Sequence, residues 1–395
     1  MNILILGGNG FLGWPASIYL SNRGHNITIV DNFYKDKICK KMNISTLYEV
    51  PELNERIKIW KNLSGNQINF YNFDLQDPKK FKDLFENKLI NESENKHNFE
   101  IPDAIIHFAE QPSAPYSMMD IYSSKETLIN NVAITNNLVF CVKEYCINAH
   151  IIHLATMGEY GTPNIDIEEG WLKINHKNRS DDFLFPRQGS SIYHTSKIMD
   201  TDLLWFACRN WGIKVTDLIQ GPVYGTDTDE TLMDTRLSTK YYYDEIFGTV
   251  LNRFIVQAVC NHPLTVYGKG NQKRGFINIR DVMQCIEHAV SEKLNQGQLK
   301  IYNQITEVFS VLQLANRIKE LLLKNDLKKI DVLKMDNPRV EKEEHYYNPS
   351  YTGLEKLGLK PTKLEDKDIL SMYKKVKNFE NMIDKSLIIK NIKWI

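Results

Sequence analysis

Residues 2–13 read NILILGGNGFLG, an apolar run followed by four glycines. The apolar run predicts a buried strand, and the glycines satisfy G-x-x-G-x-x-G from Gly7 and G-x-G-x-x-G from Gly8. Such glycines let the backbone approach a pyrophosphate, whose charge then lies at the N-terminus of the next helix. We expect that helix to end near Gly24 and a second strand to finish at Asp31. This order of strand, glycine turn, helix and strand favours a dinucleotide site over an ordinary tight turn.

Short apolar runs alternate with helix-like segments through the first half of the chain. Strands linked in this way form a parallel sheet with right-handed crossovers, and runs that are apolar throughout indicate strands covered on both faces. The predicted fold class is α/β, a Rossmann-type doubly wound parallel sheet with a smaller, discontinuous α/β lobe. The predicted strands are residues 3–6, 27–30, 69–73, 104–108, 151–155 and 214–219.

The length of 395 residues exceeds that of one ordinary domain. We place a large domain at residues 1–220 plus about 276–304, and a smaller lobe at about 221–275 plus 305–395. A helix is predicted at 311–323. The charged segment 34–67 is long for a connection between two elements. Because Trp60 and Leu63 give it apolar side chains to bury, we keep open that part of the segment covers a ligand.

The chain has 49 basic and 49 acidic residues, so it offers no basic surface for nucleic acid or anionic lipid. Any anion must be bound by a few placed donors. No leader and no long apolar stretch is visible, so we expect a cytoplasmic protein with no membrane partner. The six cysteines lack C-x-x-C pairs, and we assign neither disulfides nor a metal site.

The ends of the predicted strands supply the remaining cofactor contacts. A carboxylate at Asp31 accepts hydrogen bonds from a ribose and repels a 2′-phosphate, which favours NAD over NADP. Residues that end the third and fourth strands would lie beside the adenine and the nicotinamide half. The predicted NAD contacts are Gly7, Gly8, Asn9, Gly10, Phe11, Leu12, Gly13, Asp31, Asn32, Asp74, Leu75, Phe108, Ala109, Glu110, Asn130, Tyr193, Lys197, Gln220 and Val223.

Tyr193 and Lys197 lie four residues apart, which places both side chains on one helical face. An ammonium close to a phenol favours the phenolate, so we expect Lys197 to lower the pKa of Tyr193. The tyrosine could then accept a proton from a sugar hydroxyl. Lys197 is also placed to bind the nicotinamide ribose.

The glycine-rich turn, Thr156 at a strand end and the Tyr193/Lys197 pair together resemble the extended short-chain dehydrogenase/reductase family. Residues 263–268 (PLTVYG) and 274–281 (RGFINIRD) resemble its nucleotide-sugar branch. Longer runs resemble the UDP-sulfoquinovose synthase family. These runs are 110–111 (EQ), 113–118 (SAPYSM), 156–170 (TMGEYGTPNIDIEEG), 229–231 (DET), 337–341 (NPRVE) and 343–348 (EEHYYN).

The resemblance implies an enzyme that uses tightly held NAD to make UDP-sulfoquinovose from UDP-glucose and sulfite. NAD would oxidise C4, loss of water would leave a 4-keto-5,6-ene, sulfite would add at C6, and the hydride would return to C4. Thr156, Tyr193 and Lys197 would serve hydride transfer. The family also implies a homodimer. Scarce free sulfite is compatible with a partner protein that supplies it, but no motif names that partner.

Two steps lack an obvious residue. Nucleotide-sugar 4,6-dehydratases carry Thr-Asp-Glu where this chain has Thr156-Met157-Gly158, so we expect Glu159 or His194 to handle protons at C5 and C6. The synthase family has Arg after Glu-Gln, but this chain has Pro112, which cannot supply charge-assisted hydrogen bonds to sulfite. The remaining candidates for that anion are Gln111, Arg187, Gln188 and His194.

The diphosphate of the substrate calls for convergent guanidinium groups. Two alternatives stay open for Arg280, a contact with a phosphate or an internal ion pair with its neighbour Asp281. Two also stay open for Val266 and Tyr267, a contact with the uracil or packing within the lobe. The predicted substrate contacts are Gln111, Thr156, Gln188, Asn252, Arg253, Val266, Tyr267, Gln272, Arg274, Arg339 and Glu341.

Two other classes stay open on the sequence alone. A UDP-sugar 4-epimerase or dehydratase would share the oxidation step without the sulfur chemistry. A catalytically silent NAD-binding protein would be expected to lack one of Thr156, Tyr193 and Lys197, and all three are present.

Overall fold

The computed structural model describes residues 1–337 and 346–388. Its centre is a parallel seven-stranded sheet in the order β12-β8-β5-β4-β1-β2-β3. Successive strands run outward from β1 in one direction and from β4 in the other, so the chain reverses between these two neighbours. The strands are β1 Asn2–Leu6, β2 Asn26–Val30, β3 Ile68–Tyr71, β4 Ala104–His107, β5 His150–Thr156, β8 Lys214–Gln220 and β12 Leu299–Gln304.

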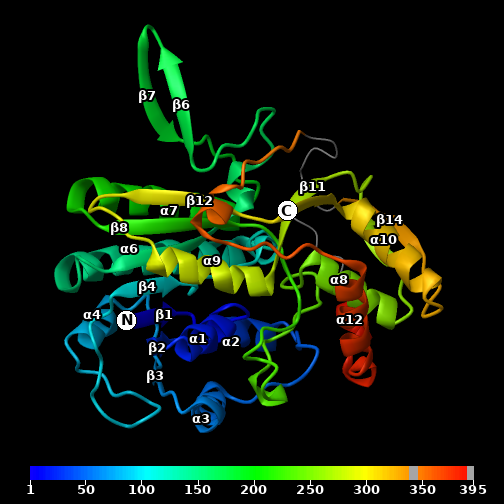
Figure 1. The fold of residues 1–395 in the computed structure, drawn as a ribbon, viewed down its shortest axis with the longest axis horizontal. Helices are drawn as coiled ribbons and strands as arrows, with labels where there is room; N and C mark the ends of the chain where they lie inside the picture. The colour runs from blue at the N-terminus through cyan, green and yellow to red at the C-terminus, as the bar shows by residue number, and fades with distance from the viewer. Residues whose placement is uncertain (338–345, 389–395) are drawn as a thin grey trace.

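Helices cover both faces of this sheet, as the apolar strands predicted (Figure 1). Within β1, Ile3 and Ile5 pack in one hydrophobic cluster while Leu4 and Leu6 pack in the other, because side chains alternate along a strand. The first cluster includes α1 Gly13–Asn22, α3 Leu53–Ser64 and α9 Ile279–Ser291, and the second includes α4 Pro78–Phe85, α6 Ile121–Tyr145 and α7 Ile192–Trp211.

A third cluster forms beside the sheet, mostly from later parts of the chain, and Ile38, Leu47 and Tyr48 of the segment 34–67 also belong to it. Figure 1 shows α8, α10 and α12 grouped to one side of the sheet. The predicted helix at 311–323 is confirmed as α10. The elements here are β9 Val223–Tyr224, α8 Val250–Val259, β10 Leu264–Tyr267, β11 Lys273–Asn278, β13 Glu307–Ser310, α10 Val311–Lys324, β14 Val332–Met335 and α12 Asp366–Lys377.

Two smaller elements add to these layers. A hairpin of β6 Trp171–His176 and β7 Arg179–Leu184 projects away from the body (Figure 1). Helix α11, Gly353–Leu357, packs on α9 and β12.

No helix among the described residues is both long and apolar enough to cross a membrane. All six cysteines are free.

The segment 34–67 folds as α2, Tyr34–Lys41, and α3. Trp60 on α3 is fully buried, and its indole N–H donates to Ser21 Oγ on α1 at 2.9 Å. Leu63 remains exposed. Trp60 therefore anchors the segment to the sheet domain and does not line the cleft described below, whereas the first turn of α2 does.

Replacing Trp60 with alanine should lower the free energy of unfolding by about 3–5 kcal/mol, because it leaves a large cavity and an unpaired hydroxyl. Urea unfolding measures this change. The matched control is Lys61→Ala on the exposed face of the same helix, which should change the unfolding free energy by less than about 0.5 kcal/mol. Equal effects of the two substitutions would contradict this role for Trp60.

Candidate active site

The glycine-rich turn is shaped by contacts that exclude side chains. Gly7 has a φ of 85°, and a Cβ there would lie 2.8 Å from the backbone of Phe108 and Ala109, which follow β4. A Cβ on Gly13 would lie 2.1 Å from the carbonyl oxygen of Gly7. The turn therefore packs tightly against the start of α1, and the backbone at Gly10 faces the cleft. These features fit the pyrophosphate of a dinucleotide.

Asp31 follows β2 and organises this turn. One carboxylate oxygen accepts from the backbone N–H of Asn9 at 2.8 Å, and the other accepts from the backbone N–H of Phe33 at 2.7 Å. Burial raises the pKa of Asp31, and the two backbone donors oppose that rise. The Asn9 side chain donates to Asp36 at 2.7 Å, and Asp36 accepts from Lys240 at 2.6 Å. Asp31 also lines the cleft, where a ribose would meet it.

A single cleft of about 700 Å³ runs from the glycine turn over the strand ends to the third hydrophobic cluster. Most of the predicted residues line it. The NAD candidates in its wall are Gly7, Asn9, Gly10, Phe11, Leu12, Gly13, Asp31, Asn32, Leu75, Phe108, Ala109, Glu110, Asn130, Tyr193, Lys197, Gln220 and Val223. The substrate and catalytic candidates in its wall are Thr156, Gln188, His194, Asn252, Arg253, Tyr267, Gln272 and Arg274.

Other predicted residues lie outside that wall. Gly8 packs on Ile29, Asp74 caps the backbone N–H of Gln76, and Val266 is buried in strand β10. The amide of Gln111 is used internally, because it donates to Ser113 O and Thr127 Oγ1. Arg280 forms an ion pair with Asp229 rather than with Asp281. Arg339 and Glu341 lie outside the described residues.

Glu159 and Arg187 also lie behind the wall. Glu159 is fully buried, 3.6 Å from Arg187, and accepts from the backbone N–H of Thr156 at 3.4 Å. Burial raises the pKa of Glu159 to about 7, and Arg187 opposes that rise. This pair therefore supports the end of β5 from beneath, and neither side chain lines the cleft.

Thr156, Tyr193 and His194 meet at one place in the cleft. Thr156 ends β5 and Tyr193 lies in the first turn of α7, whose N-cap is the Ser191 hydroxyl. A Cβ at Gly158 would lie 2.2 Å from Nε2 of His194, so the imidazole packs against the Gly158 backbone. Ser190 Oγ lies 3.1 Å from the other ring nitrogen of His194.

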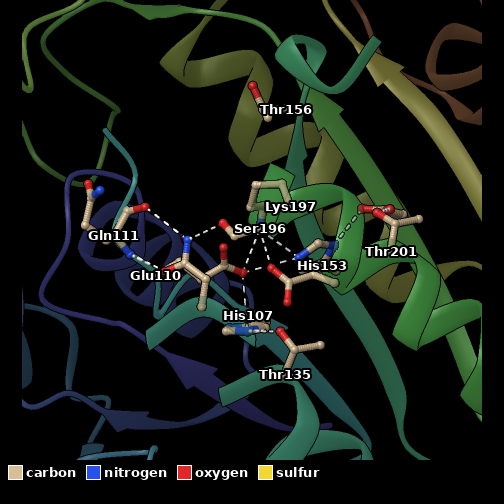
Figure 2. Close-up of polar contacts among 12 residues, drawn as sticks. His107, Glu110, Gln111, Thr135, His153, Thr156, Ser196, Lys197 and Thr201 are labelled. Carbon is tan, nitrogen blue, oxygen red and sulfur yellow. Dashed lines mark hydrogen bonds and ion pairs between the residues drawn. The ribbon is translucent and has the colours of Figure 1, made fainter. Parts of the chain in front are cut away.

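Lys197 is one helical turn beyond Tyr193. Its side chain turns toward the buried Glu110 and His153 (Figure 2). Its Nζ lies 2.6 Å from Glu110 Oε1 and 2.7 Å from His153 Nε2. Burial raises the pKa of Tyr193 above its ordinary value, although Lys197 opposes the rise. The expected net lowering of that pKa is therefore wrong for this arrangement, because desolvation outweighs an ammonium that is paired with Glu110.

Glu110, His153 and Asp200 each offer a ligand atom within 4.8 Å of the others. Such a group resembles a metal site in its donor types. Here the ammonium of Lys197 lies against all three, at 2.6 Å from Glu110, 2.7 Å from His153 and 4.0 Å from Asp200, so a cation of the chain itself already balances the cluster. We assign no metal to it.

Several residues of this site were missed in the sequence. His153 and Asp217 stand inside apolar strands, and a buried polar residue in such a run is the signal that could have found them. Lys35 and Lys240 also line the cleft, from α2 and from the loop before α8. Their positions follow from tertiary packing, and nothing in their local sequence marks them.

The chain matches the model of the NAD dependent epimerase/dehydratase family over residues 3–303. It is 41% identical over 392 residues to a UDP-sulfoquinovose synthase, chloroplastic, of Spinacia oleracea, covering 99% of this chain and 79% of that one. It is 38% identical to a UDP-sulfoquinovose synthase of Sulfolobus acidocaldarius, covering 100% and 98%. A UDP-glucose 4-epimerase of Bifidobacterium longum, solved with NAD+ and UDP, is 19% identical with a TM-score of 0.67, covering 97% and 99%.

A doubly wound sheet with a glycine turn and a Thr156/Tyr193/Lys197 wall defines an NAD-dependent enzyme of the epimerase/dehydratase family, to which the chain belongs. The similarity over the whole chain narrows this class. Within it, the chain is a member of the UDP-sulfoquinovose synthase family.

Proposed function

We propose that this cleft converts UDP-glucose and sulfite to UDP-sulfoquinovose. The observation that carries the proposal is that Thr156, Tyr193 and His194 line one cleft together with the glycine turn. Bound NAD supplies a hydride acceptor for C4 of the glucosyl unit and later a hydride donor to the same carbon. Oxidation at C4 acidifies the C5 proton, which makes loss of water across C5 and C6 feasible.

Four residues of the cleft wall have distinct roles in this proposal. Tyr193 accepts the proton of the C4 hydroxyl as the hydride leaves and returns it in the last step. Thr156 holds that hydroxyl by a hydrogen bond. Lys197 supports the phenolate and contacts the nicotinamide ribose, and Asp31 contacts the adenosine ribose.

Of the two residues considered, Glu159 and His194, His194 is the better candidate to transfer the protons at C5 and C6. Gly158 stands where 4,6-dehydratases have a carboxyl residue, and the missing side chain is what admits the His194 imidazole to that space. Glu159 does not line the cleft, so we assign it a supporting role beneath Thr156. Gln188 and His194 line the cleft beside this point and are the proposed sulfite contacts, whereas Gln111 and Arg187 do not reach it.

The later part of the chain is proposed to hold the nucleotide. Arg253 and Arg274 line the cleft and supply guanidinium groups for the diphosphate, and Tyr267 and Gln272 lie beside them for the uridine. This supports the division into an NAD domain, residues 1–220 plus about 276–304, and a nucleotide-sugar lobe, about 221–275 plus 305–395. A cytoplasmic location stays a prediction, since one relative is named chloroplastic.

We also propose that two copies associate through α6 and α7. Tyr122, Ile129 and Phe140 are exposed and recur at helical spacing on α6, and Phe206 is exposed on the neighbouring α7. Phe140 and Phe206 both contact Trp211, with ring centroids 5.0 and 5.3 Å away. An apolar surface that crosses two packed helices is typical of a homodimer interface.

Incubating the purified protein with UDP-glucose and sulfite should yield a sulfonated nucleotide sugar, detected by mass spectrometry. Tyr193→Phe should slow its formation by about a hundredfold to ten-thousandfold, because the proton acceptor is lost. Tyr145→Phe, outside the cleft on α6, is the matched control and should leave the rate unchanged. UDP-galactose as the product, with no sulfonated sugar, would instead favour a 4-epimerase.

Light scattering of the wild-type protein should give the mass of a dimer, and a combined Phe140→Glu and Phe206→Glu variant should give half that mass. Two buried unpaired carboxylates per subunit would disfavour the interface. Ile174→Lys on the β6–β7 hairpin is the control and should remain dimeric. A monomeric wild type, or a dimeric double variant, would contradict this interface.

A further inference from the structure

A layer of buried charge lies beneath the cleft, between the segment that follows β4, the middle of β5, the middle of β8 and the helix α7. Figure 2 shows Lys197 lying between Glu110 and His153. On the far side of the imidazole, His153 Nδ1 is 2.8 Å from Asp217 Oδ1, and the other oxygen of Asp217 accepts from the hydroxyl of Thr201 at 2.6 Å. The side chains of His153 and Asp217 are completely buried, and those of Lys197 and Glu110 nearly so.

The direction of these hydrogen bonds fixes the charge of the imidazole. An ammonium group can only donate, so at 2.7 Å from Lys197 Nζ the Nε2 atom of His153 must accept. The single imidazole proton is then on Nδ1, where it is donated to Asp217. In this arrangement His153 is neutral, and Lys197 alone neutralises Glu110.

A second arrangement is available to the same atoms. Nε2 of His153 lies 3.3 Å from Oε1 of Glu110, which is already close to hydrogen-bonding distance. A protonated His153 would donate Nδ1–H to Asp217 and Nε2–H to Glu110, so these two carboxylates would be satisfied without Lys197. Release of Lys197 would also break its 4.0 Å ion pair with the buried Asp200, whose raised pKa of about 8 favours the neutral acid. Two cationic donors cannot share the 2.7 Å contact between Nζ and Nε2, so Lys197 would have to leave.

We propose that His153 is a positioning residue for Lys197: protonation of His153 releases the ammonium from Glu110 into the cleft. The cleft is the direction open to it, because Lys197 already lines that wall together with Tyr193. In the released position the ammonium lies nearer the phenol that must ionise. The step transfers one proton from solvent to Nε2 and changes no covalent bond between heavy atoms.

The charged and buried groups around His153 set its pKa. Burial and Lys197 lower its pKa, but Asp217 and Glu110 raise it more, to about 9. His107, from β4, has a pKa lowered to about 3 by burial and stays neutral. Asp200 on α7 and Glu159 after β5 are the remaining ionisable neighbours, and burial raises the pKa of each, to about 8 and about 7. The raised pKa means that His153 gains its proton, and Lys197 is released, as the pH falls through that value, whereas the arrangement with neutral His153 and Lys197 on Glu110 belongs to the alkaline side.

The test compares the pH dependence of hydride transfer in three variants. It rests on the proposed function for its readout, the NADH absorbance that forms when NAD-loaded protein meets UDP-glucose. His153→Gln can accept from Lys197 but cannot carry a proton, and His153→Lys carries a fixed charge that satisfies the carboxylates. His150→Gln is the matched control, since His150 is buried on the same strand against Thr216 and outside the cleft.

In the wild type and in His150→Gln, the rate should fall as pH rises through about 9. His153→Gln should be about tenfold slower near neutral pH and should lack this fall, because Lys197 stays on Glu110 at every pH. His153→Lys should restore the rate and also lack the fall. The wild-type alkaline fall persisting in His153→Gln, or equal losses in the Gln and Lys variants, would overturn the proposal.

A separate measurement distinguishes failure of this inference from failure of the proposed function. If wild-type protein forms no NADH with UDP-glucose, the proposed function fails, and NMR of the imidazole nitrogens in the NAD-loaded protein still tests His153. A proton bound at Nε2 near neutral pH and lost near pH 9 supports the inference. An imidazole that stays neutral from about pH 6 upward overturns it.

Discussion

The close approach of β1 and β4 is the constraint on which the rest of the molecule depends. Gly7 lies directly against the backbone of Phe108 and Ala109, and no residue with a side chain fits there. The two halves of the sheet diverge from this point, so the ends of β1 and β4 border an open crevice. The residues that line the cleft are arranged around that crevice, with the glycine turn on one side and Glu110 on the other.

The buried charges under the crevice connect the fold to the chemistry. Glu110 follows β4, Asp217 belongs to β8 and Lys197 to α7, so their contacts tie three elements together as well as setting the charge near Tyr193. A phenol in so dry a site resists ionisation. Under the proposal above, movement of one ammonium from Glu110 into the cleft would decide whether Tyr193 can accept a proton.

Much of this was predictable from local sequence. Strands covered on both faces are apolar throughout, so the first six strands of the sheet were found close to their observed bounds, and the glycine spacing located the turn. Strand β12 was missed, since it lies within a segment whose pattern alternates with polar residues. Thr156, Tyr193 and Lys197 were found by their spacing. The buried network around Lys197 was not, because Glu110, His153 and Asp217 meet only when β5, β8 and the segment after β4 come together.

Local sequence does not show contacts between distant segments, and this also explains the residues that were placed wrongly or left out. Glu159 follows Thr156 closely in sequence, yet the short helix after β5 turns it away from the cleft toward Arg187. Conversely, His194 gains its place from the absence of a side chain at Gly158, a contact between segments that are far apart in sequence. Lys35 and Lys240 reach the cleft from segments with no motif of their own.

The central claim is that the cleft removes a hydride from C4 of UDP-glucose and returns it to the same carbon. The most direct measurement uses UDP-glucose carrying deuterium at both C4 and C5, with sulfite in ordinary water, and mass spectrometry of the fragmented sulfonated product. The account predicts that deuterium is retained at C4 while the C5 position acquires a solvent proton. Loss of the C4 deuterium, or a product whose C5 hydrogen never exchanges, would contradict it.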